Sequence, residues 1–230
     1  MKELLRFLKS TLSTSGLSGY EDPVRDLIQK EWQPLVDELS VSRLGSLQGL
    51  RRGNYPEPAP LGQRPSLLLA AHMDAIGFMV TRLADGFLFF SEIGGTDPRI
   101  LPGQPVIVHG QEDLPGVIVQ PPPQLLPPEL RHRPIPSDHL LIDTGLPPHQ
   151  VEKFVRAGDL VSFGQAPVEL NEDTLFGHSL DNRASVAALT HCLHELKNRL
   201  LPWDVWAIAT VQEEVSYAGA YTSAYHLRPA

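Results

Sequence analysis

The middle of this chain differs in pattern from both ends, and this change constrains the fold most strongly. From Gly77 onward, short runs of alternating apolar and polar residues are separated by turn residues such as Asp85–Gly86. Closely spaced runs of this kind, without a recognisable helical pattern, are typical of a small all-β barrel or sandwich. We therefore predict an α/β domain, formed by residues 1–76 and 166–230, that is interrupted by an inserted β domain over residues 77–165.

Helical periodicity marks three segments of the flanking parts. Apolar residues recur at spacings of three and four over residues 2–14 and again over residues 18–32. In the second segment Asp22, followed by a proline, suits the N-cap of a helix. A third pattern covers residues 180–200, and its apolar face extends to Leu200. These segments predict helices that pack against a sheet.

Two continuous apolar runs in the flanking parts predict buried strands. The run SLLLAA, residues 66–71, is what we expect of a strand in the middle of a parallel or mixed sheet. The run WDVWAIATV, residues 203–211, predicts a second buried strand, which is followed by the beginning of another helix. Two short strands around the turn at Leu44–Gly45 complete a mixed sheet. A proline-rich stretch at residues 54–65 is predicted to be a loop, and a second one at residues 121–136 is predicted to be an extended, exposed loop.

Charge and cysteine content exclude several classes of function. The formal net charge of −8 argues against nucleic acid or an anionic membrane as a main partner. The single cysteine, Cys192, excludes an internal disulfide framework and fits a reducing compartment. The most apolar stretch is interrupted by His72 and Asp74 and is no membrane span, and the charged N-terminus does not resemble a secretory signal. We therefore predict a cytoplasmic location.

Residues that suit a metal site stand at the predicted strand ends. His72 and Asp74 lie two positions apart and face the same side, so Asp74 can hold the far ring nitrogen of His72. Asp181 lies just before a predicted helix, and Glu213 and Glu214 follow the second buried strand. Ligands bind at the carboxyl ends of strands in open α/β sheets. One histidine among several carboxylates requires cations, and these ligands suit zinc, cobalt or manganese.

Each of these residues also has a purely structural interpretation when it is taken alone. Asp181 is a suitable helix N-cap, and two glutamates at a strand end can simply be solvated. His178 is near Asp181 in sequence and is a weaker candidate for the site. His191 and His194 match no zinc-protease helix motif, so we predict that they lie on the solvated face of their helix.

An ordered set of segments resembles a known family. They read SGYED, RLGSLQG, AAHMDAIGFMV, EIGGTDPRILPGQPVIVHG, LIDTG, LDNRASVAAL and TVQEEVSYAGA, and together they cover almost the whole chain. This set is similar to metallopeptidase family forty-two, which includes the glutamyl and tetrahedral (TET) aminopeptidases and members labelled cellulase M. The resemblance implies a zinc-exopeptidase-like α/β domain with an inserted β domain used in dimerisation, assembly of dimers up to dodecamers, peptide substrates, and two divalent metal ions per subunit, zinc or cobalt.

The resemblance also implies a role for each candidate residue. His72 would bind one metal ion, and Asp74 would orient His72. Asp181 would bridge the two ions, and Glu214 would bind the second ion. Glu213 would act as the general base for hydrolysis of the peptide bond.

The chain departs from the family pattern at several positions. Ala75 and Gln124 stand where the family usually has glutamate and frequently has histidine, and Ser216 replaces a glycine. Only sixteen residues follow Glu214, whereas the family takes an aspartate and a histidine ligand further on. The resemblance therefore implies the front two-thirds of a dinuclear aminopeptidase, and we expect this piece to hold two ions poorly and to be inactive or nearly so. Two alternatives stay open: a non-catalytic paralogue that acts as a binding or assembly module, and a glycosidase, because paired carboxylates also cleave sugars.

Overall fold

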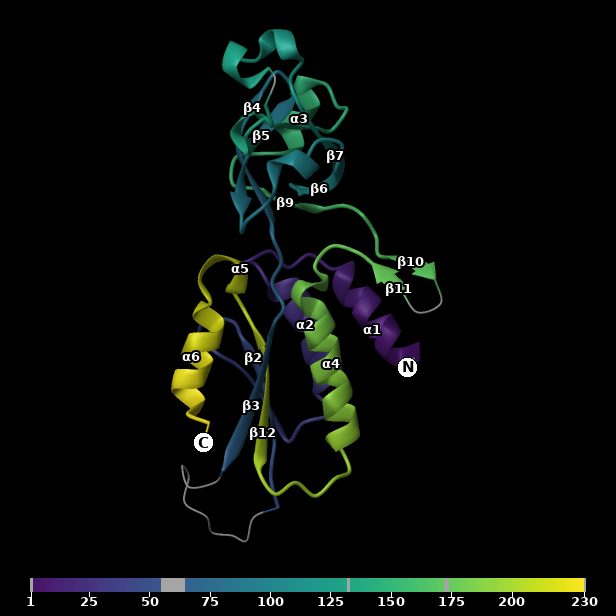
Figure 1. Ribbon diagram of the computed structural model, residues 1–230, viewed down its shortest axis with the longest axis vertical. Helices are drawn as coiled ribbons and strands as arrows, with labels where there is room; N and C mark the ends of the chain where they lie inside the picture. The colour runs from purple at the N-terminus through teal and green to yellow at the C-terminus, as the bar shows by residue number, and fades with distance from the viewer. Residues whose placement is uncertain (1, 55–64, 132, 172–173, 230) are drawn as a thin grey trace. The chain divides into compact units, whose positions relative to one another are not determined.

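The chain forms two compact units (Figure 1). Unit 1 consists of residues 1–75 and 167–230, and unit 2 consists of residues 76–166. Each unit has its own hydrophobic core, so each is described by itself. The predicted loop at residues 54–65 lies almost entirely outside the described residues. The computed structural model describes residues 2–54, 65–131, 133–171 and 174–229.

Unit 1 is built on a four-stranded mixed sheet. In spatial order its strands are β1 (Glu38–Val41), β2 (Leu47–Arg51), β12 (Asp204–Thr210) and β3 (Ser66–His72). β3 and β12 are parallel, with Ser66 opposite Asp204 and His72 opposite Thr210. β2 is antiparallel to both of its neighbours. The strands predicted in the flanking parts and the mixed α/β fold are thus confirmed.

The position of β3 differs from the prediction of a central strand. Among the described residues β3 pairs only with β12, so it lies at the edge of the sheet. Leu67 on this strand is 44% exposed. The prediction was wrong because a continuous apolar run does not report the number of hydrogen-bonded neighbours of a strand. The predicted burial of this strand is also met only in part, since three of the seven residues of β3 are buried.

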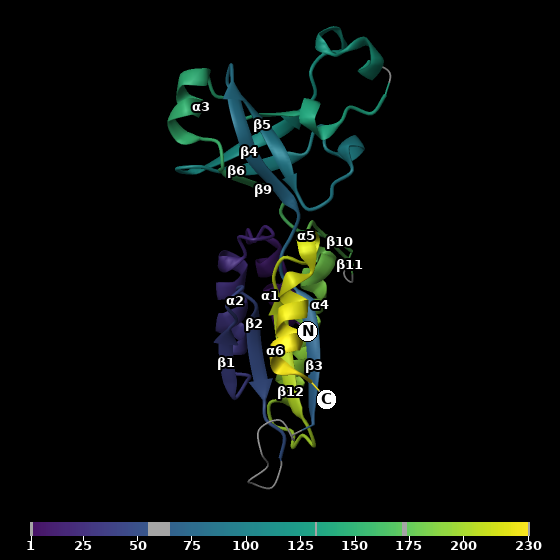
Figure 2. The same ribbon diagram turned by 90° about the vertical axis from the view of Figure 1, so that its left-hand side faces the viewer.

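Helices cover both faces of this sheet (Figures 1 and 2). The helices are α1 (Lys2–Leu12), α2 (Asp22–Trp32), α4 (Leu180–Leu196), the short α5 (Glu213–Ser216) and α6 (Ala218–Leu227). Figure 1 shows α1, α2 and α4 on one face and α6 on the other. Trp32 is fully buried in the core on the first face, and its Nε1 donates a hydrogen bond of 2.8 Å to Thr190 Oγ1. A short hairpin, β10 (Val168–Asn171) with β11 (Thr174–Phe176), also belongs to unit 1.

The third helix is shorter than its sequence pattern. α4 ends at Leu196, and Leu200, which we placed on its apolar face, is 84% exposed. A leucine at helical spacing is buried only where the core continues beneath it, and here the chain leaves the helix to enter β12.

Unit 2 is a closed barrel of six strands. In spatial order they are β4 (Gly77–Ala84), β5 (Phe87–Ile93), β8 (Leu141–Asp143), β7 (Asp113–Val119), β6 (Pro105–His109) and β9 (Leu160–Phe163). Alternate residues of these strands point inward and form the core of the unit. Phe78 lies at its centre, with its ring centroid 4.8 Å from that of Phe90 and 5.3 Å from that of Phe163. The all-β pattern of the inserted segment therefore corresponds to a barrel.

Two details of unit 2 differ from the prediction. A helix, α3 (Pro148–Phe154), lies between β8 and β9, although we recognised no helix there. It has only seven residues, of which Val151 alone is fully buried, so it leaves no repeating apolar pattern. The proline-rich segment 121–136 is also not simply extended, because it contains short 3-10 helices and buries Leu126.

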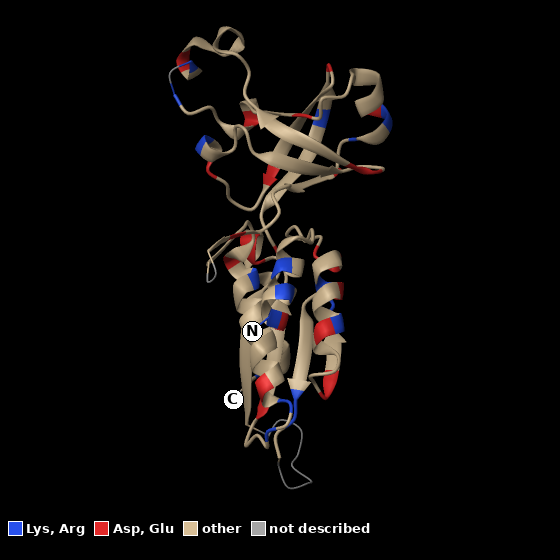
Figure 3. Cartoon of the chain, turned by 90° about the vertical axis from the view of Figure 1, so that its right-hand side faces the viewer, with Lys and Arg blue, Asp and Glu red and all other residues tan. Residues whose placement is uncertain are grey.

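Charged residues are distributed over unit 1 without separation by sign. Figure 3 shows acidic and basic positions interspersed along its helices, whereas its strands are largely free of both. No helix in the described part of the chain is long and apolar enough to cross a membrane.

Candidate metal centre

The parallel pairing of β3 and β12 brings the predicted site residues to one edge of the sheet. His72 ends β3 directly opposite Thr210, which ends β12. Asp74 follows β3 by two residues, and Glu213 and Glu214 begin α5 just beyond β12. Because both strands run in the same direction, the two sequence-distant segments meet at their carboxyl ends.

Asp74 is buried at this edge of the sheet and contacts the segments on both sides of it. It is fully buried, and its two carboxylate oxygens accept backbone hydrogen bonds of 3.1 Å from Glu213 and from Glu214. One of these oxygens also lies 3.5 Å from Nδ1 of His72. Asp74 thereby fixes the backbone of the two glutamates and the ring of His72 at the same time.

The other ring nitrogen of His72, Nε2, lies close to further carboxylates. Nε2 of His72 lies 3.1 Å from Asp181 Oδ1 and 3.5 Å from Glu213 Oε2. His72 is only 6% exposed, whereas the Asp181 side chain is 88% exposed. His72, Glu213 and Glu214 each offer a ligand atom, and these atoms all lie within 4.8 Å of one another. The described residues contain no other group of three histidine, cysteine or acidic side chains that meets this condition.

The carboxylates strongly perturb the titration of His72. Burial lowers its pKa, but the hydrogen bond and charge of Asp74, together with Glu213 and Asp181, outweigh burial and raise the pKa to about 9. Burial raises the pKa of Asp74, yet hydrogen bonds from His72 and the two glutamate amides hold that pKa below its usual value. Burial is also the main cause of the raised pKa of Glu214, which His72 opposes and the neighbouring carboxylates reinforce.

These contacts fit a divalent metal ion. A nitrogen of His72 and carboxylate oxygens of Glu213 and Glu214 lie within 4.8 Å of one another, and this donor set suits zinc and related ions. Asp181 is not a member of this group, although its Oδ1 lies 3.1 Å from His72 Nε2. The second nitrogen of His72 is held by a carboxylate, which is the usual arrangement behind a metal-binding histidine. The positive charge of the cluster rests on His72, so a cation would replace its proton and neutralise the carboxylates.

Sequence reasoning did not single out Glu21. We placed the N-cap of α2 at Asp22, but the helix begins at Asp22, and Glu21 occupies the cap position without a side-chain capping bond. The buried Glu21 carboxylate instead accepts hydrogen bonds from the backbone of Gly19 at 2.7 Å and of Gln212 at 3.0 Å. Burial is the main cause of its raised pKa. Since Gln212 immediately precedes Glu213, Glu21 supports the loop that carries the two glutamates.

Sequence reasoning also did not single out Arg183. It is completely buried and donates hydrogen bonds to backbone carbonyls, including that of Met73. The sequence did contain a signal for its burial. Arg183 stands at helical spacing from Val186, Thr190 and Leu193, which form the buried face of α4.

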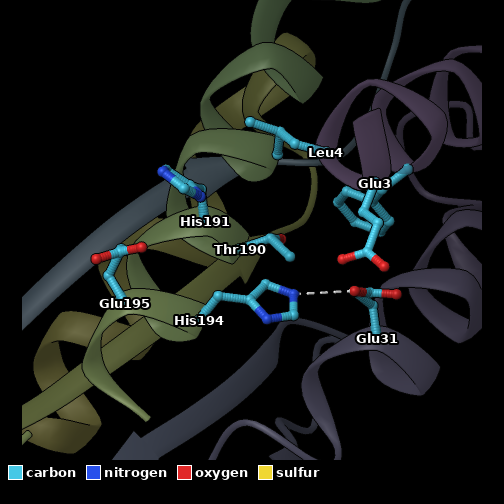
Figure 4. A pocket seen from close by; sticks show the side chains of 8 residues that line it. Glu3, Leu4, Glu31, Thr190, His191, His194 and Glu195 are labelled. Atoms are coloured by element: carbon cyan, nitrogen blue, oxygen red, sulfur yellow. Dashed lines mark hydrogen bonds and ion pairs between the residues drawn. The ribbon is translucent and has the colours of Figure 1, made fainter. Parts of the chain in front are cut away.

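The other described histidines of unit 1 do not belong to the group formed by His72, Glu213 and Glu214. His191 and His194 are exposed on α4, as we predicted. They line a surface cavity of about 200 Å³ formed by residues of α1, α2 and α4, where His194 pairs with Glu31 at 3.1 Å (Figure 4). His178 is half-buried, and burial, aided by the charge of Arg183, lowers its pKa to about 4.

Known proteins that are similar to this chain include several named aminopeptidases. The M42 glutamyl aminopeptidase family model matches residues 59–230. The putative aminopeptidase FrvX of Escherichia coli (strain K12) is 32% identical over 230 residues, which cover 98% of this chain and 62% of FrvX. The chain thus spans less than two thirds of that relative.

Solved structures include peptidases and one protein of Thermotoga maritima that is described as an endoglucanase, which is 34% identical, with a TM-score of 0.77 over 96% of this chain and 62% of that chain. A TET aminopeptidase from Thaumarchaeota archaeon SCGC AB-539-E09 is 29% identical, with a TM-score of 0.89 over 99% of this chain and 63% of that chain. The TET1 peptidase of Pyrococcus horikoshii, which can assemble into a tetrahedron or a large octahedral shell, is 31% identical, with a TM-score of 0.83 over 98% and 66% of the two chains. Sequence and structure together show that this chain belongs to the M42 glutamyl aminopeptidase family.

Proposed function

We propose that this chain carries part of the active site of an aminopeptidase that removes N-terminal residues from peptides with the help of divalent metal ions. The observation that supports this function is the convergence of His72, Asp181, Glu213 and Glu214 around the buried carboxylate of Asp74. FrvX and the TET protein of Thaumarchaeota archaeon SCGC AB-539-E09 are named aminopeptidases, which supports the reaction class.

The residues have distinct roles in this proposal. His72, Asp181 and Glu214 are the metal ligands, and Asp74 keeps Nε2 of His72 available by holding Nδ1. Zinc or cobalt, when bound, would polarise the peptide carbonyl and lower the pKa of water. Glu213, whose carboxylate faces His72, accepts the proton of the attacking water and returns it to the leaving amine.

Metal binding and turnover test the proposal. Zinc or cobalt is titrated into the purified chain by calorimetry, and hydrolysis of an aminoacyl-anilide is compared with hydrolysis of a soluble cellulose derivative. Metal binding that H72A abolishes, together with anilide hydrolysis, supports the aminopeptidase. Metal binding without hydrolysis favours the non-catalytic alternative or an incomplete site, and cleavage of the cellulose derivative favours a glycosidase. Equal binding by the native chain and H72A would refute the assigned ligands.

A matched pair of variants separates the two adjacent glutamates. E213Q and E214Q remove one charge each from neighbouring positions of α5. E213Q should keep the metal affinity of the native chain, because the ligands stay, and it should lose whatever turnover the native chain has, because the base is lost. E214Q should lose metal affinity. The opposite pattern would exchange the two roles, since both carboxylates belong to the group around His72.

The inserted barrel has a proposed role in self-association. Its support is the assembly of the TET1 peptidase of Pyrococcus horikoshii and the separate hydrophobic core of unit 2. Replacement of residues 77–165 by a short linker should convert a dimer or larger assembly into a monomer, as measured by light scattering. An unchanged mass of the assembly would contradict this role.

The proposed location is the cytoplasm. Its support is the single cysteine, Cys192, which suits a reducing compartment. Fractionation of cells that produce the protein provides the measurement, and recovery from an extracytoplasmic fraction would contradict the proposal.

A further inference from the structure

A single buried arginine connects the segments around the candidate metal centre. Arg183 lies two residues after Asp181 at the start of α4 and is 0% exposed. Its guanidinium donates hydrogen bonds to four backbone carbonyls, those of Met73 (3.1 Å), Thr14 (2.6 Å), Gly16 (3.4 Å) and Thr11. One side chain therefore ties the start of α4 to the end of α1, to the loop after α1 and to the end of β3.

The contact with Met73 is the one closest to the proposed ligands. Met73 lies between His72 and Asp74, and both of its backbone groups are engaged. Its N–H donates a hydrogen bond of 2.9 Å to Thr210 at the end of β12, while its carbonyl accepts from Arg183. Met73, the residue between His72 and Asp74, is thus hydrogen-bonded to β12 through its N–H and to Arg183 of α4 through its carbonyl group.

The loop after α1 is fitted closely around the guanidinium. The Gly16 carbonyl accepts from Arg183 and also from the backbone N–H of Ala75 at 3.0 Å. A Cβ atom on Gly16 would lie 2.8 Å from Nη2 of Arg183 and 2.4 Å from Cγ1 of Val24. Glycine is therefore required at this position, and the same loop contacts Arg183 and the residue after Asp74.

The chemistry of these contacts favours arginine over other residues. A planar guanidinium presents five N–H donors in a fixed fork, whereas lysine presents three donors from one point. No carboxylate within 4.0 Å of Arg183 is found among the described residues, so backbone carbonyls provide its hydrogen bonds. Burial lowers its pKa to about 10, so it stays protonated at pH 7, and Asp74 is the charge that opposes this shift.

We propose that Arg183 is a positioning residue for the candidate metal centre. By holding the Met73 carbonyl, it fixes the position of His72 and Asp74 relative to Asp181 at the start of α4. Asp74 then holds the amides of Glu213 and Glu214. The inference rests on the proposed function for the identity of the metal ligands, but the placement of Asp74 can be measured without metal.

Hydrogen exchange in the metal-free protein measures that placement. The amides of Glu213 and Glu214 donate to Asp74, so their exchange rates report on its position. R183M should increase both rates by about tenfold or more, the range expected when a local opening becomes easier. R183K should increase the two exchange rates less, because lysine keeps the positive charge but lacks the fixed fork of N–H donors. The amide of Ala207 in the middle of β12 should not change.

R51M is a matched control. Arg51 also binds a backbone carbonyl of another segment, that of Lys197 at 3.0 Å, and it pairs with Asp37. It lies opposite Val205, at the end of β12 that is distant from the site. R51M should therefore leave the exchange of the Glu213 and Glu214 amides unchanged.

Zinc titration by calorimetry provides the second readout. R183M should weaken zinc binding at least about tenfold, R183K should weaken it less, and R51M should leave it unchanged. Unchanged exchange at the two glutamate amides in R183M would overturn the inference. So would an equal acceleration of all amides of unit 1, since Arg183 would then only stabilise the fold. If the native chain binds no zinc, the proposed function fails, while the exchange rates still decide the role of Arg183.

Discussion

Replacement of Asp74 by asparagine should lower the pKa of His72 and change how the stability of unit 1 depends on pH. In the folded chain Asp74 is the foremost of the groups that oppose burial and raise this pKa to about 9 from 6.5. A group with a raised pKa in the folded state stabilises that state fully below its unfolded pKa. The stabilisation is lost as the pH rises through the folded pKa.

The size of the effect follows from the shift. A rise from 6.5 to about 9 corresponds to about 3 kcal/mol, since each pKa unit is worth about 1.4 kcal/mol. Between these pH values the free energy of unfolding of the metal-free chain should fall by up to about 1.4 kcal/mol per pH unit. In D74N the fall between these pH values should be smaller, because the charge of Asp74 no longer raises the pKa of His72. D74N should also be less stable overall, because the amide nitrogen of asparagine cannot accept a backbone hydrogen bond.

Tryptophan fluorescence suits the measurement. The three tryptophans, Trp32, Trp203 and Trp206, all belong to unit 1, so urea unfolding followed by their emission reports this unit. Unfolding is measured from pH 6 to pH 9 for the native chain and D74N, and NMR follows the His72 ring directly. D113N is the control, because Asp113 pairs with a histidine of unit 2. Equal slopes in the native chain and D74N, or a His72 pKa near 9 in D74N, would refute the reasoning.

Three further predictions concern packing. T190V should lower the free energy of unfolding by about 1–3 kcal/mol in urea titrations, because it leaves the Trp32 indole N–H unpaired in the core. An unchanged free energy would mean that this N–H finds another partner. G219A should destabilise unit 1 in the same assay, since its Cβ would lie 2.4 Å from the Val211 carbonyl oxygen, and native stability would contradict that contact. Residues 76–166 expressed alone should give dispersed NMR spectra of a folded barrel, because the unit has its own core, and an unfolded spectrum would show that it depends on unit 1.

The sequence was sufficient to bring the acidic residues and His72 together. Two continuous apolar runs ending in polar residues predict two strands of one sheet, and parallel neighbours place those ends side by side. The register of His72 opposite Thr210 produces this arrangement. The edge position of β3 was not predictable in the same way. The hydropathy of a strand depends on what its side chains contact, whereas an edge position depends on its backbone hydrogen bonds, which do not affect the choice of side chains.

The residues that hold the backbone around the site were harder to predict. Glu21 and Arg183 act mainly on backbone groups, and a backbone carbonyl or amide has no sequence signature. Helical spacing indicates that Arg183 is buried, but it does not indicate which carbonyls it contacts. The partners depend on how α1 and its following loop pack, which is a tertiary property.

The insertion of the barrel between β3 and β12 has a consequence for the order of folding. Their pairing joins residues about 140 positions apart in the chain, and closing so long a loop costs conformational entropy. Within the barrel, β4 pairs with β9, so Phe78 lies opposite Val161 and the two ends of the insertion are held together. Once the barrel has formed, the loop that remains to be closed is only about 50 residues, which reduces the cost by about 1 kcal/mol. We therefore expect the barrel to fold first and to accelerate the pairing that assembles the metal centre.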